Sequence, residues 1–474
     1  MKKLYWLVIM LLACRVCDGQ NANIKRTWHW YFGGEAGIDF SSSTAVVDTN
    51  SAMNTPEGSA CISDTSGNLL FYTDGKNVWN KLHQIMPNGT GLLGGLNGSC
   101  TQSSLIIPQP GVSNLYYLFT TDETNGYYGF RYSIVDMNLD GANGDITSQK
   151  NILLFAPCAE KLSAVNHCND SSIWIAAHKV GTNEFCTYLL TSQGLDTVPV
   201  ISAVGSVLDS MDWINPLAGQ LKFSSDGRKA ATPIFGLFRL ELYDFDNQTG
   251  LFSNPIIIST NDSLACGVEF SFNNLFLYFT TINGKLFQFD ISSDDSAIIT
   301  ISKTLIYNDN NYYGFGQLQK AHDGKIYVGS STVIRKASVI NYPDSAGLSC
   351  NFTDTSFNLN PGLTFLHGNK IGMPNFNCSY FRMVNGSSCN TGISEIQNNA
   401  IKVFPNPFTD NFTISLNKKE PVELTLYDIP SRKLLQQKFT TSTTINTSQL
   451  ARGIYIYEVR NDKGVVKQGK VVKE

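Results

Sequence analysis

The chain has 474 residues, of which 42% are hydrophobic and 16% are charged, and its formal net charge is −4. This balance excludes a wholly disordered chain, and the absence of a basic excess disfavours nucleic-acid binding. At about 100–200 residues per domain, the length fits a few ordinary domains or one large repeat domain with a smaller one. The 39 Gly, 20 Tyr and 28 Phe, spread among short β-rich runs, predict an all-β protein.

Residues 1–19 have the pattern of an export signal. Two lysines precede an apolar run, residues 4–13, that is too short to span a bilayer. We expect cleavage before Gln20. As an alternative, residues 11–14 resemble a lipoprotein box, in which Cys14 would carry lipid. No later run of 18 apolar residues occurs, so we expect no membrane-spanning helix.

The cysteines and histidines disfavour a zinc site. Eleven cysteines occur, and the nine outside the signal are an odd number in an exported chain, so at least one is unpaired; spacing does not reveal the pairing. Outside the signal there is no Cys-x-x-Cys pair, and the six histidines form no His-x-His or His-Glu-x-x-His array. The chain also lacks a Gly-x-Ser-x-Gly elbow and a Walker loop, which disfavours hydrolase and nucleotide functions.

A turn followed by a β-rich strand recurs along the body of the chain. Its Asp/Asn/Gly residues tolerate the positive φ of tight hairpin turns. The turns lie 46 to 58 residues apart, at Gly67, Ser113, Ser171, Gly227, Asn274 and Gly324. This period predicts a β-propeller over residues 27–383 with four strands per blade. Seven blades are favoured and six remain possible. We expect residues 28–47 and 372–376 to share one closing blade that ties the ring shut.

The last part of the chain has a different composition. Residues 384–400 are polar and predict a linker, and residues 401–474 return to short alternating strands, as in a small antiparallel β-sandwich. The whole chain is thus expected to be a β-propeller followed by a small C-terminal β-sandwich.

Four separated motifs, in order, give this tail a family resemblance. They are Val-Phe-Pro-Asn-Pro at 403–407, Leu-Tyr-Asp at 426–428, Leu-Ala-Arg-Gly-Ile-Tyr at 450–455 and Gly-Lys-Val-Val-Lys at 469–473. The tail resembles the C-terminal sorting domain of the type IX secretion system of Bacteroidota. It departs from the family at residues 429–432, where a Gly usually precedes the basic residue. The resemblance implies that six motif residues take part in sorting: Pro405, Asn406, Pro407, Gly453, Gly469 and Lys470.

The resemblance implies a route and a partner. The type IX machinery would carry the chain from the periplasm across the outer membrane, and the tail would usually be removed, leaving the protein secreted or attached to the cell surface. Residues 27–383 also look like propellers of no assigned activity that often precede such tails. The stretches that carry this likeness include Trp-Tyr-Phe-Gly at 30–33 and Gly-Met-Pro-Asn-Phe at 372–376.

Propellers usually bind their ligands at the mouth of the central channel, where the innermost strands converge. Six polar residues near the starts of these strands are candidates for ligand binding: Glu57, Gln102, Lys161, Gln220, Glu269 and Gln317. They are expected to form a polar ring. The alternative is that they solvate the channel or satisfy neighbouring backbone groups.

A candidate calcium loop begins at Asp136. With Asn138, Asp140 and Gly141 it matches the start of a loop in which alternate oxygens wrap a hard cation, although position twelve is Thr147 and not Glu. The alternative is an ordinary turn after a blade strand.

The favoured function is a secreted or surface propeller that binds a glycan or another surface protein without catalysis. The alternative is an extracellular enzyme acting on polysaccharide at the channel mouth.

Overall fold

The computed structural model describes residues 22–42, 44–95, 98–123, 126–209, 215–260, 262, 264–309, 314–332, 336–359, 368–382, 389, 401–416, 419–428, 432–461 and 464–474. The export signal predicted at 1–19 lies outside the described residues, as does the predicted linker at 384–400 apart from Cys389. The chain divides into two compact units, Met1–Ser387 and Ser388–Glu474. In the part of the chain that the structure describes, no helix has the length and apolar character to cross a membrane.

The first unit contains seven sheets, counted over its described residues. Sheet 1 consists of β1 (His29–Phe32), β2 (Ala36–Asp39) and β3 (Val46–Val47). Sheet 2 consists of β4 (Ala60–Ser63), β5 (Leu69–Thr73) and β6 (Val78–Asn80). Sheet 3 consists of β7 (Ser104–Pro108), β8 (Leu115–Thr120), β9 (Phe130–Asp136), β10 (Asp145–Ile146) and β11 (Ile152–Phe155). Sheet 4 consists of β12 (Cys158–Asn166), β13 (Ile173–Lys179), β14 (Thr182–Thr191), β15 (Gly194–Leu195) and β16 (Val200–Leu208).

Three four-stranded sheets complete this unit. Sheet 5 consists of β17 (Lys222–Phe223), β18 (Lys229–Ile234), β19 (Arg239–Asp246) and β20 (Leu251–Ser259). Sheet 6 consists of β21 (Ala265–Phe270), β22 (Phe276–Thr281), β23 (Lys285–Asp290) and β24 (Thr304–Asn308). Sheet 7 consists of β25 (Leu318–Lys320), β26 (Ile326–Val328), β27 (Lys336–Ile340) and β28 (Phe352–Asn358). The short helices are η1 (Ala22–Thr27), η2 (Asp140–Ala142), α2 (Ser296–Ile301), η3 (Gly347–Cys350) and η4 (Cys378–Phe381).

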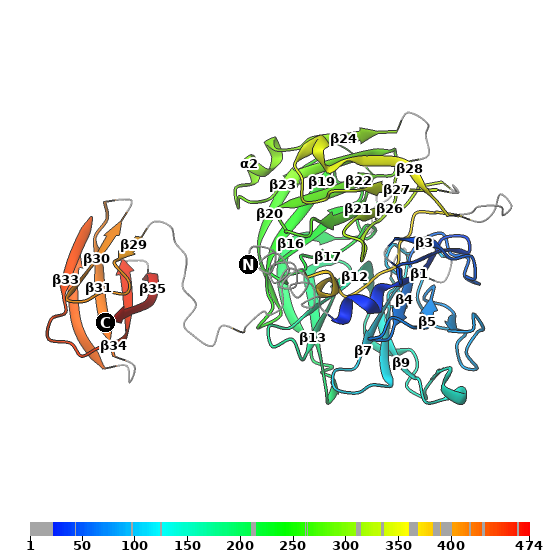
Figure 1. The fold of residues 1–474 in the computed structure, drawn as a ribbon, viewed down its shortest axis with the longest axis horizontal. Coiled ribbons are helices and arrows are strands. Elements are labelled where there is room, and N and C mark those ends of the chain that lie inside the picture. Colours follow the sequence, from blue (N-terminus) through cyan, green and yellow to red (C-terminus); the bar gives the residue numbers. More distant parts are fainter. Residues whose placement is uncertain are drawn as a thin grey trace, which may run out of the picture. The chain divides into compact units, whose positions relative to one another are not determined.

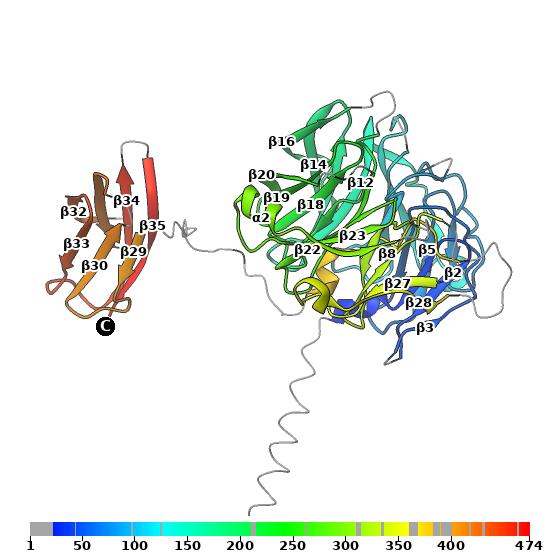
Figure 2. The ribbon, with the colours of Figure 1, turned by 90° about the horizontal axis from the view of Figure 1, so that it is seen from above.

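The seven sheets are the blades of a propeller. The first strands of successive sheets contact one another from β1 to β25, so they form the inner ring. The sheets follow in chain order around the unit, and β28 of the last sheet comes back beside the first sheet in both views (Figures 1 and 2). Trp30 of β1 meets Tyr327 of β26 with ring centroids 5.6 Å apart, which joins the last blade to the first. The all-β propeller is therefore confirmed, with seven blades.

The repeated turns occupy the predicted places. All six lie in the hairpin between the first two strands of blades 2 to 7. Gly227, for example, has φ +71° and Asn274 has φ +59°, conformations that Gly and Asn adopt at low cost. Over the described residues, the expectation of four strands per blade is confirmed for blades 5 to 7, whereas blades 1 and 2 have three strands each and blades 3 and 4 have five. After β6 the described chain continues through a loop rich in Gly, which is poorly suited to a further strand.

The closing blade predicted from residues 28–47 and 372–376 is also wrong. Among the described residues, the strands of blade 1 come from the N-terminal side and those of blade 7 lie before residue 359, and Gly368 makes an isolated bridge with Gly34 of blade 1. Residues 368–381, here called the strap, instead run between the inner strands of several blades. Pro374 forms a parallel bridge with Ser59 before β4, and Asn377 forms one with Ala164 of β12. The strap therefore occupies the centre of the ring.

The second unit contains two antiparallel sheets around one core. The first consists of β29 (Ile401–Phe404), β30 (Asn411–Leu416) and β33 (Ser442–Asn446). The second consists of β31 (Val422–Tyr427), β32 (Lys433–Phe439), β34 (Gly453–Asn461) and β35 (Gly464–Lys473). Phe412, Leu424 and Val459 from both sheets are fully buried in this core. Alternating buried and exposed positions along β30 are the pattern that predicted a small β-sandwich.

Candidate functional site

The strap runs through the centre of the ring and forms hydrogen bonds to blades 2, 3, 4 and 7. The backbone N–H of Asn375 donates to the carbonyl of Ser59 (2.8 Å), and its side-chain amide donates to the carbonyl of Leu162 (2.9 Å). Gly372 passes so close to the backbone that an added Cβ would lie 1.9 Å from the carbonyl oxygen of Glu57. Only glycine fits there without moving the strap.

Three of the predicted site residues, the glutamines, lie inside this packed channel. The side-chain oxygen of Gln102 accepts hydrogen bonds from the N–H groups of Leu162 (3.0 Å) and Leu221 (2.7 Å). That of Gln220 accepts from Val268 (3.2 Å) and Leu318 (3.0 Å).

Gln317 completes the set. Its oxygen accepts from the N–H of Met373 in the strap (2.9 Å), and its amide donates to the carbonyl of Thr101. The structure thus brings the three glutamines together, and their polar groups join neighbouring and non-neighbouring blades. This is the arrangement of the alternative interpretation, in which they satisfy backbone groups.

Glu269 lies in a buried ionic cluster and not at a channel opening. Its carboxylate is 3.6 Å from the ammonium of Lys222 and 3.9 Å from that of Lys320, and all three side chains are at most 3% exposed. The backbone N–H of Phe270 also donates to it (3.0 Å). Burial lowers the pKa of Lys320, while Glu269 opposes that shift.

Lys161 is buried against backbone carbonyls. Its ammonium donates to Ala218 (2.8 Å), Gly219 (3.2 Å) and Pro233 (3.0 Å). Burial lowers the pKa of Lys161 to about 7, against the opposing effect of the neighbouring Glu160. Its hydrogen bonds therefore join blade 4 to blade 5, and its side chain does not face solvent.

Of the six predicted residues, Glu57 lines a cavity at the channel mouth. This cavity, here called the mouth pocket, has a volume of about 170 Å³. Its lining residues are Glu57, Ser99, Thr101, Glu160, Asn215, Ala218, Gly219, Phe235, Cys266, Ile282 and Ile371. Glu57 precedes β4, and Glu160 is among the first residues of β12. The pocket therefore lies at the starting ends of the inner strands.

The mouth pocket holds two carboxyl groups. Glu57 accepts a hydrogen bond from the Ser99 hydroxyl (3.1 Å), and Glu160 accepts from the N–H (2.9 Å) and the hydroxyl (2.8 Å) of Thr101. Burial, followed by the charges of Glu160 and Glu123, raises the pKa of Glu57 to about 7. Sequence reasoning missed Glu160, although it stands directly before the candidate Lys161.

The candidate calcium loop begins at the end of β9. The Asp136 carboxylate accepts hydrogen bonds from the side-chain amide of Asn114 (2.7 Å) and from the N–H of Asn138 (2.9 Å). Asp140 starts η2 and has φ +50°. These contacts describe a capped turn, and calcium binding at Asp136, Asn138 and Asp140 stays a prediction.

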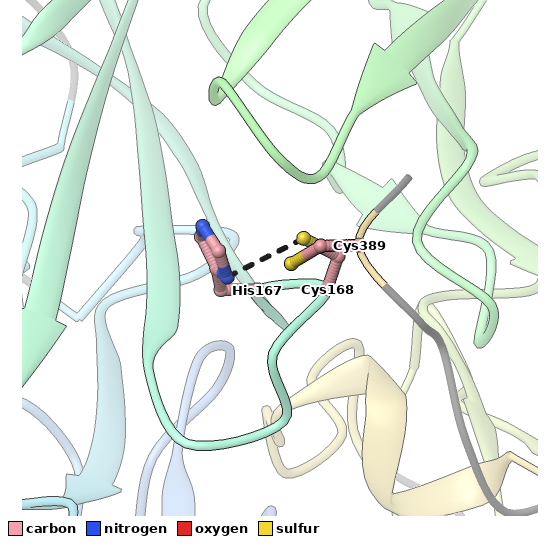
Figure 3. A group of neighbouring side chains, drawn as sticks. All are labelled: His167, Cys168 and Cys389. Atoms are coloured by element: carbon pink, nitrogen blue, oxygen red, sulfur yellow. Dashed lines mark hydrogen bonds between the residues drawn. The ribbon is translucent and has the colours of Figure 1, made fainter. Parts of the chain in front are cut away.

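Another group of possible metal ligands occurs at the turn after β12. One nitrogen of His167 and the sulfurs of Cys168 and Cys389 lie within 4.8 Å of one another (Figure 3). Both cysteines are disulfide-bonded, so neither sulfur is a thiolate ligand. The other cysteines that the structure describes are buried and free: Cys61, Cys100, Cys158, Cys186, Cys266, Cys350 and Cys378.

The sorting motifs, far apart in the sequence, meet in the second unit. The side chain of Asn406, between Pro405 and Pro407, donates to the carbonyl of Lys470 (3.0 Å) and accepts from the N–H of Val472 (2.9 Å). Gly453 begins β34 and pairs with Lys473 of β35. Gly469 lies against Tyr457, where an added Cβ would be 2.7 Å from the tyrosine hydroxyl.

A family profile matches this unit. Residues 402–474 fit the family described as "Secretion system C-terminal sorting domain". The tail is a type IX sorting domain. It marks the protein for export through the type IX secretion system, so the protein is secreted or displayed at the cell surface. Among curated proteins, no match to this chain is found.

Several solved structures are similar to this chain, at low sequence identity. A putative 6-phosphogluconolactonase from Bacteroides uniformis is 11% identical, covers 82% of this chain and 100% of its own, and has a TM-score of 0.39. The Pseudomonas aeruginosa periplasmic gluconolactonase is 11% identical over 85% of this chain and 94% of its own, with a TM-score of 0.38. The Dos1 propeller is 14% identical over 72% and 87%, with a TM-score of 0.40. Because these TM-scores are below 0.5, the similarity carries no argument about what this chain does.

Proposed function

We propose that this exported propeller is a binding protein whose mouth pocket accepts a basic side chain of a surface-protein partner. The observation that carries the proposal is the pair of carboxyl groups, Glu57 and Glu160, in one small pocket. With a volume of about 170 Å³, the pocket is below the range of roughly 300–1,000 Å³ typical of small-molecule sites. It suits one inserted side chain better than a sugar chain.

Charge favours a cation in this place. Two desolvated carboxylates repel each other, which is part of the reason that the pKa of Glu57 is raised to about 7. An ammonium or guanidinium group placed between them would pair with both and relieve the repulsion. The ammonium of Lys161, on which the charge of Glu160 acts, donates its hydrogen bonds to three carbonyl groups.

The same observation supports a second function, a polysaccharide-acting enzyme. A carboxyl group with a raised pKa beside a second carboxyl is the arrangement that glycosidases use for a general acid and its partner. In this case Glu57 would donate the proton and Glu160 would act as base or nucleophile. The small volume of the pocket weighs against it, because such an enzyme must surround a sugar ring.

Binding and turnover separate the two functions. The chain without its export signal would be titrated with lysine-rich and glutamate-rich peptides of equal length, and incubated with neutral and acidic glycans. We expect the lysine-rich peptide alone to bind, with affinity that rises from pH 6 to pH 8 as Glu57 ionises through its pKa of about 7. Glu57→Gln should weaken binding roughly tenfold and flatten the pH dependence.

The matched control is Glu184→Gln, the same change on β14, the third strand of blade 4, at a residue that does not line the mouth pocket. It should bind like the unaltered chain. Release of sugar products that stops in Glu57→Gln would establish the enzyme instead. Equal binding of both peptides would rule out the acidic pocket as the recognition site.

A further inference from the structure

A second cavity lies at the opposite ends of the inner strands. It has a volume of about 320 Å³, within the range of roughly 300–1,000 Å³ usual for small-molecule sites. It is bordered by η1, by the turn after β7, by the turn after β12 and by η4 at the end of the strap. The mouth pocket is at the starts of these strands, so the two cavities are separate. We call the second one the turn pocket.

The turn pocket contains a guanidinium group without a carboxylate partner. The Nε of Arg26 donates to the side-chain oxygen of Asn23 (3.1 Å), and its Nη1 reaches the carbonyl of Ser63 at 3.5 Å. Over the described ranges, no carboxylate forms an ion pair with Arg26. Arg26 also forms a side-chain hydrogen bond with Tyr116. Since a guanidinium has five N–H donors and three of them are engaged, donors remain for a ligand.

A buried phenol supplies the second observation. Tyr380 of η4 lines the turn pocket and is 2% exposed, and its hydroxyl has no hydrogen-bond partner among the described residues. A buried hydroxyl without a partner is costly, so it indicates a ligand group that would form a hydrogen bond with it. The charge of Arg26 acts on Tyr380, as it does on the neighbouring Tyr116, so the cation and the two hydroxyls belong to one region.

The other side of the pocket carries acceptors and amides. Asp170 pairs with Arg382 (2.8 Å) and accepts from the amide of Asn166 (3.3 Å), so its charge is neutralised while its oxygens can still accept further hydrogen bonds. The walls between these groups include Pro108 and Ile173. A molecule that fits must have an anionic end for Arg26, hydroxyl groups for Asp170, and C–H faces for the apolar walls.

We propose that the turn pocket binds a sugar acid, whose carboxylate pairs with Arg26 and accepts from Tyr380 and whose ring hydroxyls donate to Asp170. A guanidinium and a carboxylate match in a bidentate geometry. A pyranose ring carrying one carboxylate combines all three features in a volume of this size.

The test titrates the chain without its export signal with galacturonic acid, and with galactose and acetate as partial ligands. Galacturonate should bind saturably, and galactose and acetate should each bind at least roughly tenfold more weakly. Arg26→Gln should lower galacturonate affinity by roughly tenfold or more, and Tyr380→Phe by several-fold, with its melting temperature unchanged or higher.

Two controls make the result specific. Arg228→Gln removes the same charge from the turn between β17 and β18, which does not line the turn pocket, and should bind galacturonate normally. Glu57→Gln in the mouth pocket should also leave galacturonate affinity unchanged. Arg26→Lys keeps the positive charge but lacks the paired N–H donors of a guanidinium, so it should bind galacturonate more weakly than the unaltered chain. Equal affinity for acetate and galacturonate, or an unchanged affinity in Arg26→Gln, would overturn the proposal.

Discussion

The side-chain amide of Asn375 in the strap donates to the backbone carbonyl of Leu162 in blade 4 at 2.9 Å, across 213 residues of sequence. Gln102 of blade 3 donates to the side-chain oxygen of the same asparagine at 3.5 Å. One asparagine, 4% exposed, therefore links the end of the propeller chain to the innermost strands. The ring is closed from its centre and not by a shared outer blade.

We expect Asn375→Ala to lower the free energy of unfolding of the propeller by about 1–3 kcal/mol, because it leaves buried backbone and amide groups without partners. Urea unfolding followed by tryptophan fluorescence measures the change. Gln193→Ala, at the exposed turn between β14 and β15, is the control and should shift stability by at most about 0.5 kcal/mol. Equal effects of the two changes would mean that the strap does not hold the ring.

Glu57 should make stability fall as pH rises from 4.5 to 7. Its pKa is 4.5 in the unfolded reference and about 7 in the fold, so in this window the folded state holds a proton that the unfolded state has lost. Raising the pH then favours unfolding. The melting temperature of the unaltered chain minus that of Glu57→Gln, measured across this window, should fall as the pH rises, because the glutamine does not titrate. A constant difference would contradict the raised pKa.

Lys161 should make the stability of the fold rise with pH, at pH values above those at which Glu57 acts. Its pKa falls from 10.5 to about 7 in the fold, so between these values the unfolded state binds the extra proton and stability rises with pH. Lys161→Met, which keeps the length of the side chain, should remove this rise in a series of thermal melts. If the rise persists in Lys161→Met, other groups cause it.

The final strand of the tail should be required for export. Deleting residues 469–474 removes the pairing of β35 with Gly453–Tyr457 and the bonds to Asn406, and exposes a sheet edge. We expect a folded propeller that accumulates in the periplasm, detected by cell fractionation. Residues 401–474 fused to an unrelated exported domain should carry it to the surface, and the same fusion without 469–474 should not. Normal external levels of the truncated chain would contradict this.

Calcium bound at Asp136, Asn138 and Asp140 would raise the melting temperature of the propeller by mass action. Asp140→Ala should then remove the rise in melting temperature that calcium causes. Asp246→Ala, which alters a similar turn after β19, is the control. Identical melting temperatures in calcium and in chelator would leave Asp136 as a turn cap only.

The sequence by itself determined the features that depend on local chemistry. The six turns from Gly67 to Gly324 need residues that tolerate positive φ, so their spacing alone predicted the blades. The sorting motifs of the tail could be identified from the sequence for a similar reason. Asn406 and Gly469 each satisfy a contact that few other residues can make.

The tertiary structure alone decided what lies in the channel and which polar residues reach a cavity. Glu57 and Gln317 both stand shortly before an inner strand, yet Glu57 lines the mouth pocket and Gln317 hydrogen-bonds to the strap. Glu57 and Glu160 become neighbours only when blades 2 and 4 curve around the strap. Ring closure brings together groups more than a hundred residues apart, and no local pattern encodes these distances, because each depends on how the whole ring packs.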